Sequence, residues 1–323
     1  MTRTMTVVLA VILVAALAAG CRGKQEAAPG EQEKQPARLI GISVLTMGNP
    51  FFVDIIENAR AEAARHGYEL IAVSGEFDAP TQYQQVKDFI VKKVSAIILT
   101  PCDSKGVGTA IQEANAAGIP VFTADIACLA DGAKVVSHVA SNNYTGGRLA
   151  AKAMMEALGN KGKVAIIDHP EVESVIQRTK GFRDELKDAK SPIEIVKVLA
   201  GGGKKEKALP VAQEILTTHG DLNGIFAIND PSALAAVAAI EIARKTGQIV
   251  VIGFDGQPEG KKAILEGKIH ADPIQFPDQI GRKTVQTIMK HLNGEKVPAE
   301  ILIPTRLYYK ADAEKDPSLT KSE

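Results

Sequence analysis

The sequence predicts an α/β protein made of two doubly wound lobes, each built on a parallel sheet. From Leu39 onward, short apolar runs rich in β-branched residues alternate with amphipathic segments. This is the pattern of parallel strands whose sheet is covered on both faces by helices. The alternation runs to about residue 141 and then begins again. The length of 323 residues also fits two domains of about 150 residues each.

Composition narrows the class of protein. Hydrophobic residues make up 45% and charged residues 24% of the chain, and these ordinary globular values exclude a wholly disordered protein. Lys and Arg together number 38, as do Asp and Glu, so the chain lacks the basic excess of a typical nucleic-acid-binding protein. Three cysteines are too few for a scaffold held together by disulfides.

The first residues predict export and a lipid anchor. Arg3 precedes the apolar run Val7–Ala19, which as a helix would rise only ~20 Å and could not cross a bilayer core of about 30 Å. This length suits a secretory signal, and Leu17 to Cys21 resembles a bacterial lipobox. We expect a signal peptide over 1–20, a lipid on Cys21, and a location in the periplasm or on the outer face of the cell membrane. The alternatives are a simple signal or a short anchor, with Cys21 incidental.

A tether is expected between the anchor and the folded domain. Residues 22–37 carry charges of both signs and no apolar side chain larger than alanine. A segment of this kind cannot bury enough surface to fold, so residues 21–37 are predicted to be disordered. Because the lipid supplies the anchor, no transmembrane helix is expected.

The first array predicts five strands and three helices. Gly67 and Gly118 follow two of the amphipathic segments and act as helix stop signals. The strands are expected at Leu39–Leu45, Glu69–Val73, Ala96–Thr100, Pro120–Ala124 and Val135–Val139, and the helices at Phe52–His66, Thr81–Lys92 and Lys105–Ala117.

The second array repeats the pattern and ends in two short strands. Its strands are expected at Val164–Asp168, Ile193–Leu199, Gly224–Ile228, Ile249–Phe254 and Lys268–Gln275, and near Ile301–Ile303 and Leu307–Tyr309. Its helices are expected at Tyr144–Leu158, Glu173–Leu186, Lys205–Thr217, Ser232–Lys245, Gly260–Leu265 and Asp278–Leu292.

The residues that follow the strands carry a family resemblance. Ligands of doubly wound sheets bind beyond the carboxyl ends of the strands. Five motifs stand at or beside such ends, namely Gly48-Asn49-Pro50-Phe51-Phe52, Ala124-Asp125, Phe226 to Asp230, Ile252 to Gly256, and Pro273 to Gly281. In this order and spacing they resemble the ribose and galactose type of periplasmic binding protein, the type I fold shared with LacI-type repressors. The resemblance covers about Leu39 to Lys310.

The resemblance implies two lobes joined by a hinge of three crossings, near Ser141–Asn142, Gln275–Phe276 and Pro304–Thr305. It implies a first lobe of residues 38–141 and 276–304, a second lobe of residues 142–275 and 305–312, and a flexible tail over 313–323. It also implies closure of the hinge on a ligand.

Asn, Asp and Gln side chains with aromatic neighbours suit a ligand rich in hydroxyl groups. Amides offer donors and an acceptor, and carboxylates make strong charge-assisted bonds. By the resemblance, the ligand-binding residues are Asn49, Phe51, Phe52, Asp125, Asn229, Phe254, Asp255 and Gln275.

Several of these residues have a structural alternative. Asn49 could form only a helix-entry turn, Phe51 and Phe52 could be core residues, and the stretch around Asp255 could be an ordinary βα turn. We expect Asp230 to cap the following helix, which would leave Asn229 for the ligand.

The sequence departs from the ribose-type pattern at three places. Ile126 stands where an arginine follows the Asp125 position. A second arginine is expected five residues before Gly181-Phe182, where the count gives Ile176, or Val175 or Gln177 if a gap intervenes. Gly201-Gly202-Gly203 stands where an aromatic residue is expected.

These departures predict a ligand other than ribose, because buried hydroxyls without partners cost ~1–3 kcal/mol each. We expect a larger, less polar or deoxygenated sugar, a glycoside, or a non-sugar. Asp168, His169 and Glu173 stand where they could replace the lost groups, although His169-Pro170 could be only a turn. Lys204 or Lys205 could reach in past the glycines, or could be solvated.

Cys102 and Cys128 follow two strands expected to be neighbours, so a disulfide between them is predicted. The alternatives are two free thiols or a metal pair with His138. No Cys-x-x-Cys or His-Glu-x-x-His spacing is present, and no metal or cofactor is expected.

The leading hypothesis is a monomeric, lipid-anchored solute-binding protein that captures a sugar-like small molecule and delivers it to the permease of an ABC importer. A sensor protein that presents its ligand to a membrane receptor is the first alternative. A transcriptional regulator would need an N-terminal DNA-binding segment where the signal and tether stand. We expect no enzyme, because the chain lacks Gly-x-Ser-x-Gly, a Walker loop and a dinucleotide Gly-x-Gly-x-x-Gly after a strand.

Overall fold

The structure is a computed structural model of the chain, and it describes residues 38–320. The predicted signal peptide, the lipidation site Cys21 and the tether lie outside the described residues, as does the end of the predicted tail. No helix within 38–320 is long and apolar enough to cross a membrane.

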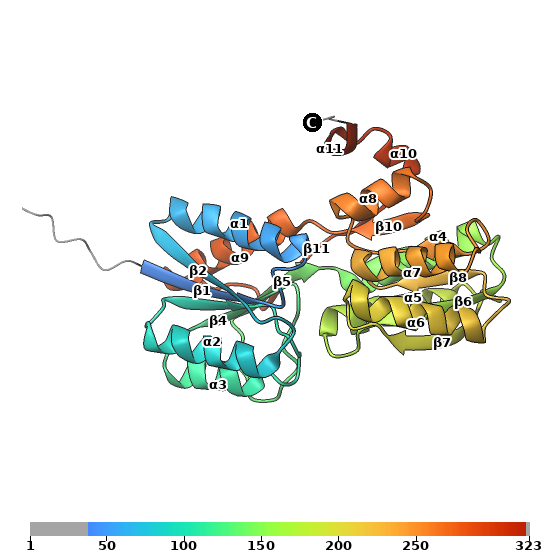
Figure 1. The fold of residues 1–323 in the computed structure, drawn as a ribbon. Helices are drawn as coiled ribbons and strands as arrows, with labels where there is room; N and C mark the ends of the chain where they lie inside the picture. Colours follow the sequence, from blue (N-terminus) through green and yellow to red (C-terminus); the bar gives the residue numbers. More distant parts are fainter. Residues whose placement is uncertain (1–37, 321–323) are drawn as a thin grey trace, which may run out of the picture. The chain divides into compact units, whose positions relative to one another are not determined.

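The first lobe is a six-stranded sheet with strand order β11-β5-β4-β3-β1-β2. Every neighbouring pair in it is parallel. Helices α1 (Pro50–Arg65) and α9 (Pro277–Leu292) cover one face of this sheet, and α2 (Ala79–Val91) and α3 (Gly108–Ala116) cover the other (Figure 1). The strands are β1 (Arg38–Val44), β2 (Tyr68–Ser74), β3 (Ala96–Leu99), β4 (Val121–Ala124), β5 (Ser137–Ser141) and β11 (Glu300–Ile303).

The second lobe is another six-stranded sheet, with strand order β12-β10-β9-β8-β6-β7. Its strands are parallel except for β12, which pairs antiparallel with β10. The strands are β6 (Lys163–Asp168), β7 (Glu194–Ala200), β8 (Gly224–Ala227), β9 (Val250–Ile252), β10 (Ala271–Ile274) and β12 (Arg306–Tyr309). The helices are α4 (Asn143–Ala157), α5 (Glu173–Asp188), α6 (Lys205–Thr218), α7 (Asp230–Ile242) and α8 (Pro258–Leu265).

The chain passes between the two sheets three times, after β5, after β10 and after β11. The α/β class and the two doubly wound, largely parallel sheets are therefore confirmed. The apolar pattern predicted these strands because a sheet covered on both faces needs apolar side chains on both sides of each strand. All residues of β3, β4 and β8 are accordingly buried.

The predicted flexible tail over 313–323 is wrong for its described part. Residues 310–320 form the short helices α10 (Lys310–Ala313) and α11 (Pro317–Thr320). The Asp316 carboxylate accepts hydrogen bonds from the Tyr308 hydroxyl at 2.8 Å and from Lys261 Nζ at 3.0 Å. These bonds hold the segment on the second lobe.

The predicted disulfide between Cys102 and Cys128 is also wrong, because both cysteines are free thiols. Cys102 is buried, its Sγ lies 3.8 Å from the Leu45 carbonyl oxygen, and burial raises the pKa of its thiol to about 12. Cys128 packs instead against the apolar cluster around α2 and α3, and its Sγ accepts a hydrogen bond from the Ala130 amide. The two thiols therefore belong to different clusters, although their strands are neighbours.

Candidate ligand-binding site

A cavity lies where the carboxyl ends of the two sheets face each other. The first lobe contributes Asn49, Phe51, Phe52, Phe77, Asp125 and Ile126 to its lining. The second lobe contributes His169, Val175, Arg178, Asn229, Asp255 and Gln275. Of the eight residues predicted to bind ligand, seven line this one cavity.

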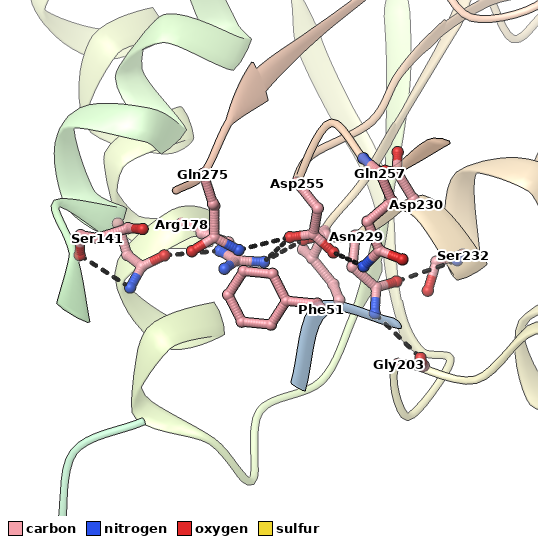
Figure 2. A network of polar contacts seen from close by, with 12 residues as sticks. Phe51, Ser141, Arg178, Gly203, Asn229, Asp230, Ser232, Asp255, Gln257 and Gln275 are labelled. Carbon is pink, nitrogen blue, oxygen red and sulfur yellow. Dashed lines mark hydrogen bonds and ion pairs between the residues drawn. The ribbon is translucent and has the colours of Figure 1, made fainter. Parts of the chain in front are cut away.

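Arg178, on α5, is the centre of the second lobe's wall. Its Nε donates to Asn143 Oδ1 at 2.8 Å, and its Nη1 donates to the Ile228 carbonyl at 2.7 Å and to Asp255 Oδ1 at 3.2 Å. Figure 2 shows this chain of contacts running from Arg178 to Asp255 and on to Gln257, whose Nε2 donates to Asp255 Oδ2 at 3.4 Å. The guanidinium lies over the Phe254 ring, 3.9 Å from its centroid. The ring and the hydrogen bonds together compensate the burial of this cation and hold its orientation.

Two glycines bring Arg178 to this position. A Cβ on Gly147 of α4 would stand 2.0 Å from the Arg178 carbonyl oxygen, and one on Gly181 of α5 would stand 2.1 Å from the Tyr144 carbonyl oxygen. Only glycine allows α4 and α5 to approach this closely. The close contact of the two helices sets the depth at which the guanidinium enters the cavity.

Asp255 and Gln275 complete the polar part of this wall. Gln275 Nε2 donates to Asp255 Oδ1 at 2.7 Å, and Gln275 Oε1 has no partner among the described residues. Asp255 has a φ of 109° and bridges to β10 at Ile274, which turns its side chain toward the cavity. Burial raises the pKa of Asp255, and Arg178 opposes that shift.

Two further carboxyl groups lie buried behind Asp255. Asp230 and Asp272 interact directly, and the pKa of Asp230 is well above its ordinary value while that of Asp272 is raised to about 6, in both cases mainly by burial. Two neighbouring carboxylates cannot both ionise in a buried site at low cost. The charge of Asp272 therefore adds to the effect of burial in raising the pKa of Asp230.

Asn229 differs from its predicted role in one respect. We expected Asp230 to cap α7, but the Asn229 side chain is the cap and accepts a hydrogen bond from the Ser232 amide at 3.0 Å. Its Nδ2 donates to the Gly203 carbonyl at 3.0 Å. Asn229 thus lines the cavity and also begins the helix, because the helix N-terminus needs an acceptor at this position.

Asn49 likewise combines two roles. It caps α1 by accepting from the Phe51 amide at 2.9 Å, and the same oxygen accepts from Gln257 Nε2 of the second lobe at 2.7 Å. Both of these bonds use the side-chain oxygen of Asn49, and its NH₂ group takes part in neither of them. Phe51 and Phe52, which follow it, meet edge to face with ring centroids 5.3 Å apart, and provide an apolar wall.

Asp125 is the one carboxylate of the first lobe's wall. It has a φ of 63° after β4, is 3% exposed, and its Oδ1 has no hydrogen-bond partner among residues 38–320. Burial raises its pKa to about 7 despite the opposing charge of Arg178. Ile126, which follows it, is 1% exposed and lines the cavity with an aliphatic side chain.

Three predicted site residues are corrected. Phe254 is fully buried beneath Arg178 and does not line the cavity. Ile176 is 37% exposed and lies in a separate surface hollow with Leu129 and Pro170. Asp168 accepts a hydrogen bond from the Thr179 hydroxyl at 2.8 Å and is absent from the lining. Each side chain is directed away from the cavity by its own partner or by its position on its helix.

Sequence reasoning missed Arg178 and Phe77. The predicted lack of both guanidinium groups is wrong in part, since Ile126 lines the cavity as expected but Arg178 also stands in it, three residues before Gly181. Val175 and Arg178 both line the cavity, and the three-residue spacing of one helix face could have identified this arginine. Phe77 stands just beyond the carboxyl end of β2, and this position could have identified it as a site residue.

The His169 ring lies beside Gly203 in the cavity wall, where the triglycine stands in place of the expected aromatic residue. A Cβ on Gly203, which has a φ of 65°, would lie 3.1 Å from His169 Nδ1. The His169 ring therefore occupies space that a side chain at position 203 would need. Phe77 of the first lobe lies 6.2 Å from this ring, and Lys204 Nζ lies over Phe77 at 3.9 Å.

The assembled side chains can hold a neutral, hydroxyl-rich molecule. Asp125 Oδ1 and Gln275 Oε1 are buried acceptors without partners, and Phe51 and Phe52 offer apolar faces to C–H groups. Within 38–320, no group of His, Cys, Asp and Glu side chains could hold a metal ion.

Two α/β lobes linked by three crossings, with a polar and aromatic cavity between them, define a solute-binding protein of the periplasmic type. A family model described as periplasmic binding protein domain matches residues 40–296. The chain therefore belongs to the periplasmic binding protein family.

Similar proteins place the chain among sugar ABC transporter solute-binding proteins. The ribose import binding protein of Escherichia coli is 36% identical over 272 residues, which cover 84% of this chain and 90% of that protein. A solute-binding protein of Actinobacillus succinogenes with bound D-allose has a TM-score of 0.79 at 31% identity, and the match covers 86% and 99% of the two chains. One from Agrobacterium vitis with bound D-fucose also has a TM-score of 0.79 at 31% identity, with 87% and 98% covered.

Proposed function

We propose that this protein captures a monosaccharide-sized sugar in the cavity between its lobes and delivers it to the permease of an ABC importer. The observation that carries this proposal is the pair of unpartnered acceptors, Asp125 Oδ1 and Gln275 Oε1, which are buried in a cavity that also holds Arg178. Buried polar atoms are almost always satisfied in native proteins. Sugar hydroxyls supply the missing donors, and the bound sugars of the similar structures support this class of ligand.

Ile126 narrows the ligand to a sugar other than ribose. Arg178 supplies a guanidinium to the cavity, although three residues before Gly181 rather than the expected five, so this inference now rests on Ile126 alone. The buried Ile126 side chain cannot bond to a hydroxyl, and a hydroxyl held against it would lose its partner at a cost of ~1–3 kcal/mol. A sugar with a methyl or methylene group at this end fits better. The D-fucose bound to the Agrobacterium vitis protein, a deoxy sugar, supports this choice.

The lipid anchor rests on the sequence of the leader. The apolar run Val7–Ala19 and the residues Leu17 to Cys21 have the order of a lipoprotein signal. A lipid on Cys21 would hold the protein at the membrane beside a permease. Mass spectrometry of the mature N-terminus tests this proposal, and a mature chain that does not begin with a lipid-modified Cys21 would overturn it.

A thermal-shift and calorimetry screen tests the ligand class. The probes are D-fucose, D-allose, D-apiose, D-ribose and myo-inositol, with wild type and the variant Ile126→Arg. We expect wild type to bind a probe other than ribose most tightly, and Ile126→Arg to gain at least tenfold in ribose affinity. Ile242→Arg is the matched control, because Ile242 is 64% exposed and lines neither the cavity nor the hollow beside Ser104, and it should change nothing. Tightest binding of ribose by wild type would refute the argument from Ile126.

A further inference from the structure

A serine of the first lobe binds the start of a second-lobe helix across the cleft. Ser104 stands in the loop between β3 and α3, and its side-chain oxygen accepts a hydrogen bond from the Glu173 amide at 2.9 Å. Its own amide donates to the Glu171 carbonyl at 3.0 Å. Ser104 is only 1% exposed, so both bonds are shielded from water.

The helix that receives Ser104 has no cap of its own. The residue at the N-cap of α5 is Val172, and its side chain makes no capping hydrogen bond. The first amide groups of a helix need an acceptor, and a serine hydroxyl is one of the preferred groups. In this protein the acceptor for the first residue of α5 comes from the opposite lobe.

The loop that carries Ser104 is fixed in the first lobe. Asp103 Oδ1 accepts hydrogen bonds from the amides of Lys105 and Gly106 at 2.8 and 2.6 Å. The Ser104 carbonyl accepts from the Leu129 amide at 2.6 Å. Leu129 belongs to the loop that begins with Asp125 and Ile126, so Ser104 is linked to the ligand-facing carboxylate of its own lobe.

The receiving helix carries the main cation of the other lobe. Val175 and Arg178 stand on the first turns of α5 and line the cavity. The contact therefore joins the Asp125 loop to the helix of Arg178 without touching the cavity itself, since Ser104 is absent from its lining.

We propose that Ser104 is a positioning residue that completes the α5 N-terminus only when the lobes are closed, and so stabilises the closed, ligand-holding state. The proposal rests on the proposed capture of a ligand between the lobes. A bond that exists in one of two conformations shifts the equilibrium toward that conformation by its own free energy. The net value of one hydrogen bond, about 0.5–1.5 kcal/mol, corresponds to roughly 2- to 12-fold in ligand affinity.

Three variants test this role. Ser104→Ala removes the acceptor, and Ser104→Thr keeps it. Ser191→Ala is the matched control, because Ser191 Oγ accepts from the Ile193 amide at 3.2 Å within one lobe and away from the cavity. Ligand affinity and dissociation rate are measured by calorimetry and stopped flow with the tightest-binding sugar of the screen above. Hydrogen exchange of the Glu173 amide is measured with and without sugar.

We expect Ser104→Ala to weaken affinity about 2- to 12-fold through faster dissociation, with the unliganded protein's thermal midpoint unchanged. The Glu173 amide should exchange at least fivefold faster in Ser104→Ala than in wild type, and Ser104→Thr should restore both values. Equal affinities in wild type and Ser104→Ala, or equal losses in Ser191→Ala, would overturn the proposal. Failure of wild type to bind any sugar would count against the proposed function. The exchange comparison is decisive with saturating sugar, and equal Glu173 exchange rates in sugar-bound wild type and sugar-bound Ser104→Ala would overturn the role of Ser104.

Discussion

The two walls of the cavity are built differently. The second lobe's wall is a network in which Asp255 accepts from Arg178 and Gln275, while Asn229 bonds to the Gly203 carbonyl and to the start of α7. The first lobe's wall has three aromatic rings, the aliphatic Ile126, the amide of Asn49, and one carboxylate whose Oδ1 has no partner among the described residues. Apart from Gln275 Oε1, the polar wall is therefore paired within the protein, whereas Asp125 Oδ1 would gain its partner from a ligand.

This difference shows that buried charges affect the stability of the fold in two different ways. In the second lobe the charged side chains stabilise each other, so removing one leaves the others buried without compensation. In the first lobe burial of Asp125 opposes folding and is retained for binding. Substitutions on the two walls should therefore have opposite effects on stability while having the same effect on binding.

The largest effect is expected from Arg178→Met. Ligand binding should weaken at least 1,000-fold, and the free energy of unfolding should fall by about 3–5 kcal/mol, because the buried Asp255 loses its cation. Calorimetry and chemical denaturation measure the two quantities. Lys163→Met removes a surface ion pair with Asp221 and serves as the control, with both quantities nearly unchanged. A stable Arg178→Met protein would show that the second lobe's wall is not held together by this residue.

Asp125→Asn should weaken binding at least 100-fold and yet leave the unliganded domain as stable as wild type or more so. Because folding raises the pKa of Asp125 to about 7, the folded state binds the proton more tightly than the unfolded chain does. This residue's contribution to stability is therefore lost as the pH rises from about 4 to 7. A thermal midpoint of Asp125→Asn below that of wild type at pH 8 would contradict the contrast between the walls.

The affinity of wild type for its sugar should depend on pH. The ligand's hydroxyl bonds to the ionised form of Asp125, so protonation competes with binding below a pKa of about 7. Calorimetry should give an affinity about tenfold lower at pH 6 than at pH 8. His169→Gln should keep this dependence, because burial lowers the pKa of His169. Loss of the pH dependence in His169→Gln would show that the titrating group is His169 and not Asp125.

The smallest effect on binding is expected from Asp272→Asn. This residue lies behind Asp255 and outside the cavity lining, so the ligand affinity should change less than threefold. The uncharged amide can donate to Asp230, and thermal unfolding at pH 8 should show a midpoint a few degrees above that of wild type. A loss of binding would place Asp272 in the ligand-contacting network.

Much of the architecture could be predicted, because a doubly wound sheet requires short apolar strands that alternate with amphipathic helices along the chain. The strands at the centre of the sheets, such as β3, β4 and β8, are short and fully buried apolar runs, and five motifs stand at or beside strand ends. The resemblance of the motifs beside those ends to a known family pointed to Asn49, Asp125, Asn229, Asp255 and Gln275, and all five line the cavity.

The remaining site residues depend on contacts that spacing alone does not show. Arg178 enters the cavity because Gly147 and Gly181 let two helices approach closely. Ile176, two residues earlier on the same helix, consequently faces the surface. Phe254 was expected to face the ligand but lies beneath the guanidinium. A ring and its cation are adjacent in space and distant in sequence, so neither position alone predicts the pair.

Calorimetric titration of wild type, Asp125→Ala and Asn229→Ala with the tightest-binding sugar at pH 8 tests the central claim most directly. One sugar per wild-type molecule should bind, and neither folded variant should bind it measurably, because each lacks one wall's contribution. Wild-type affinity in both variants would contradict the assignment of this cavity as the ligand-binding site.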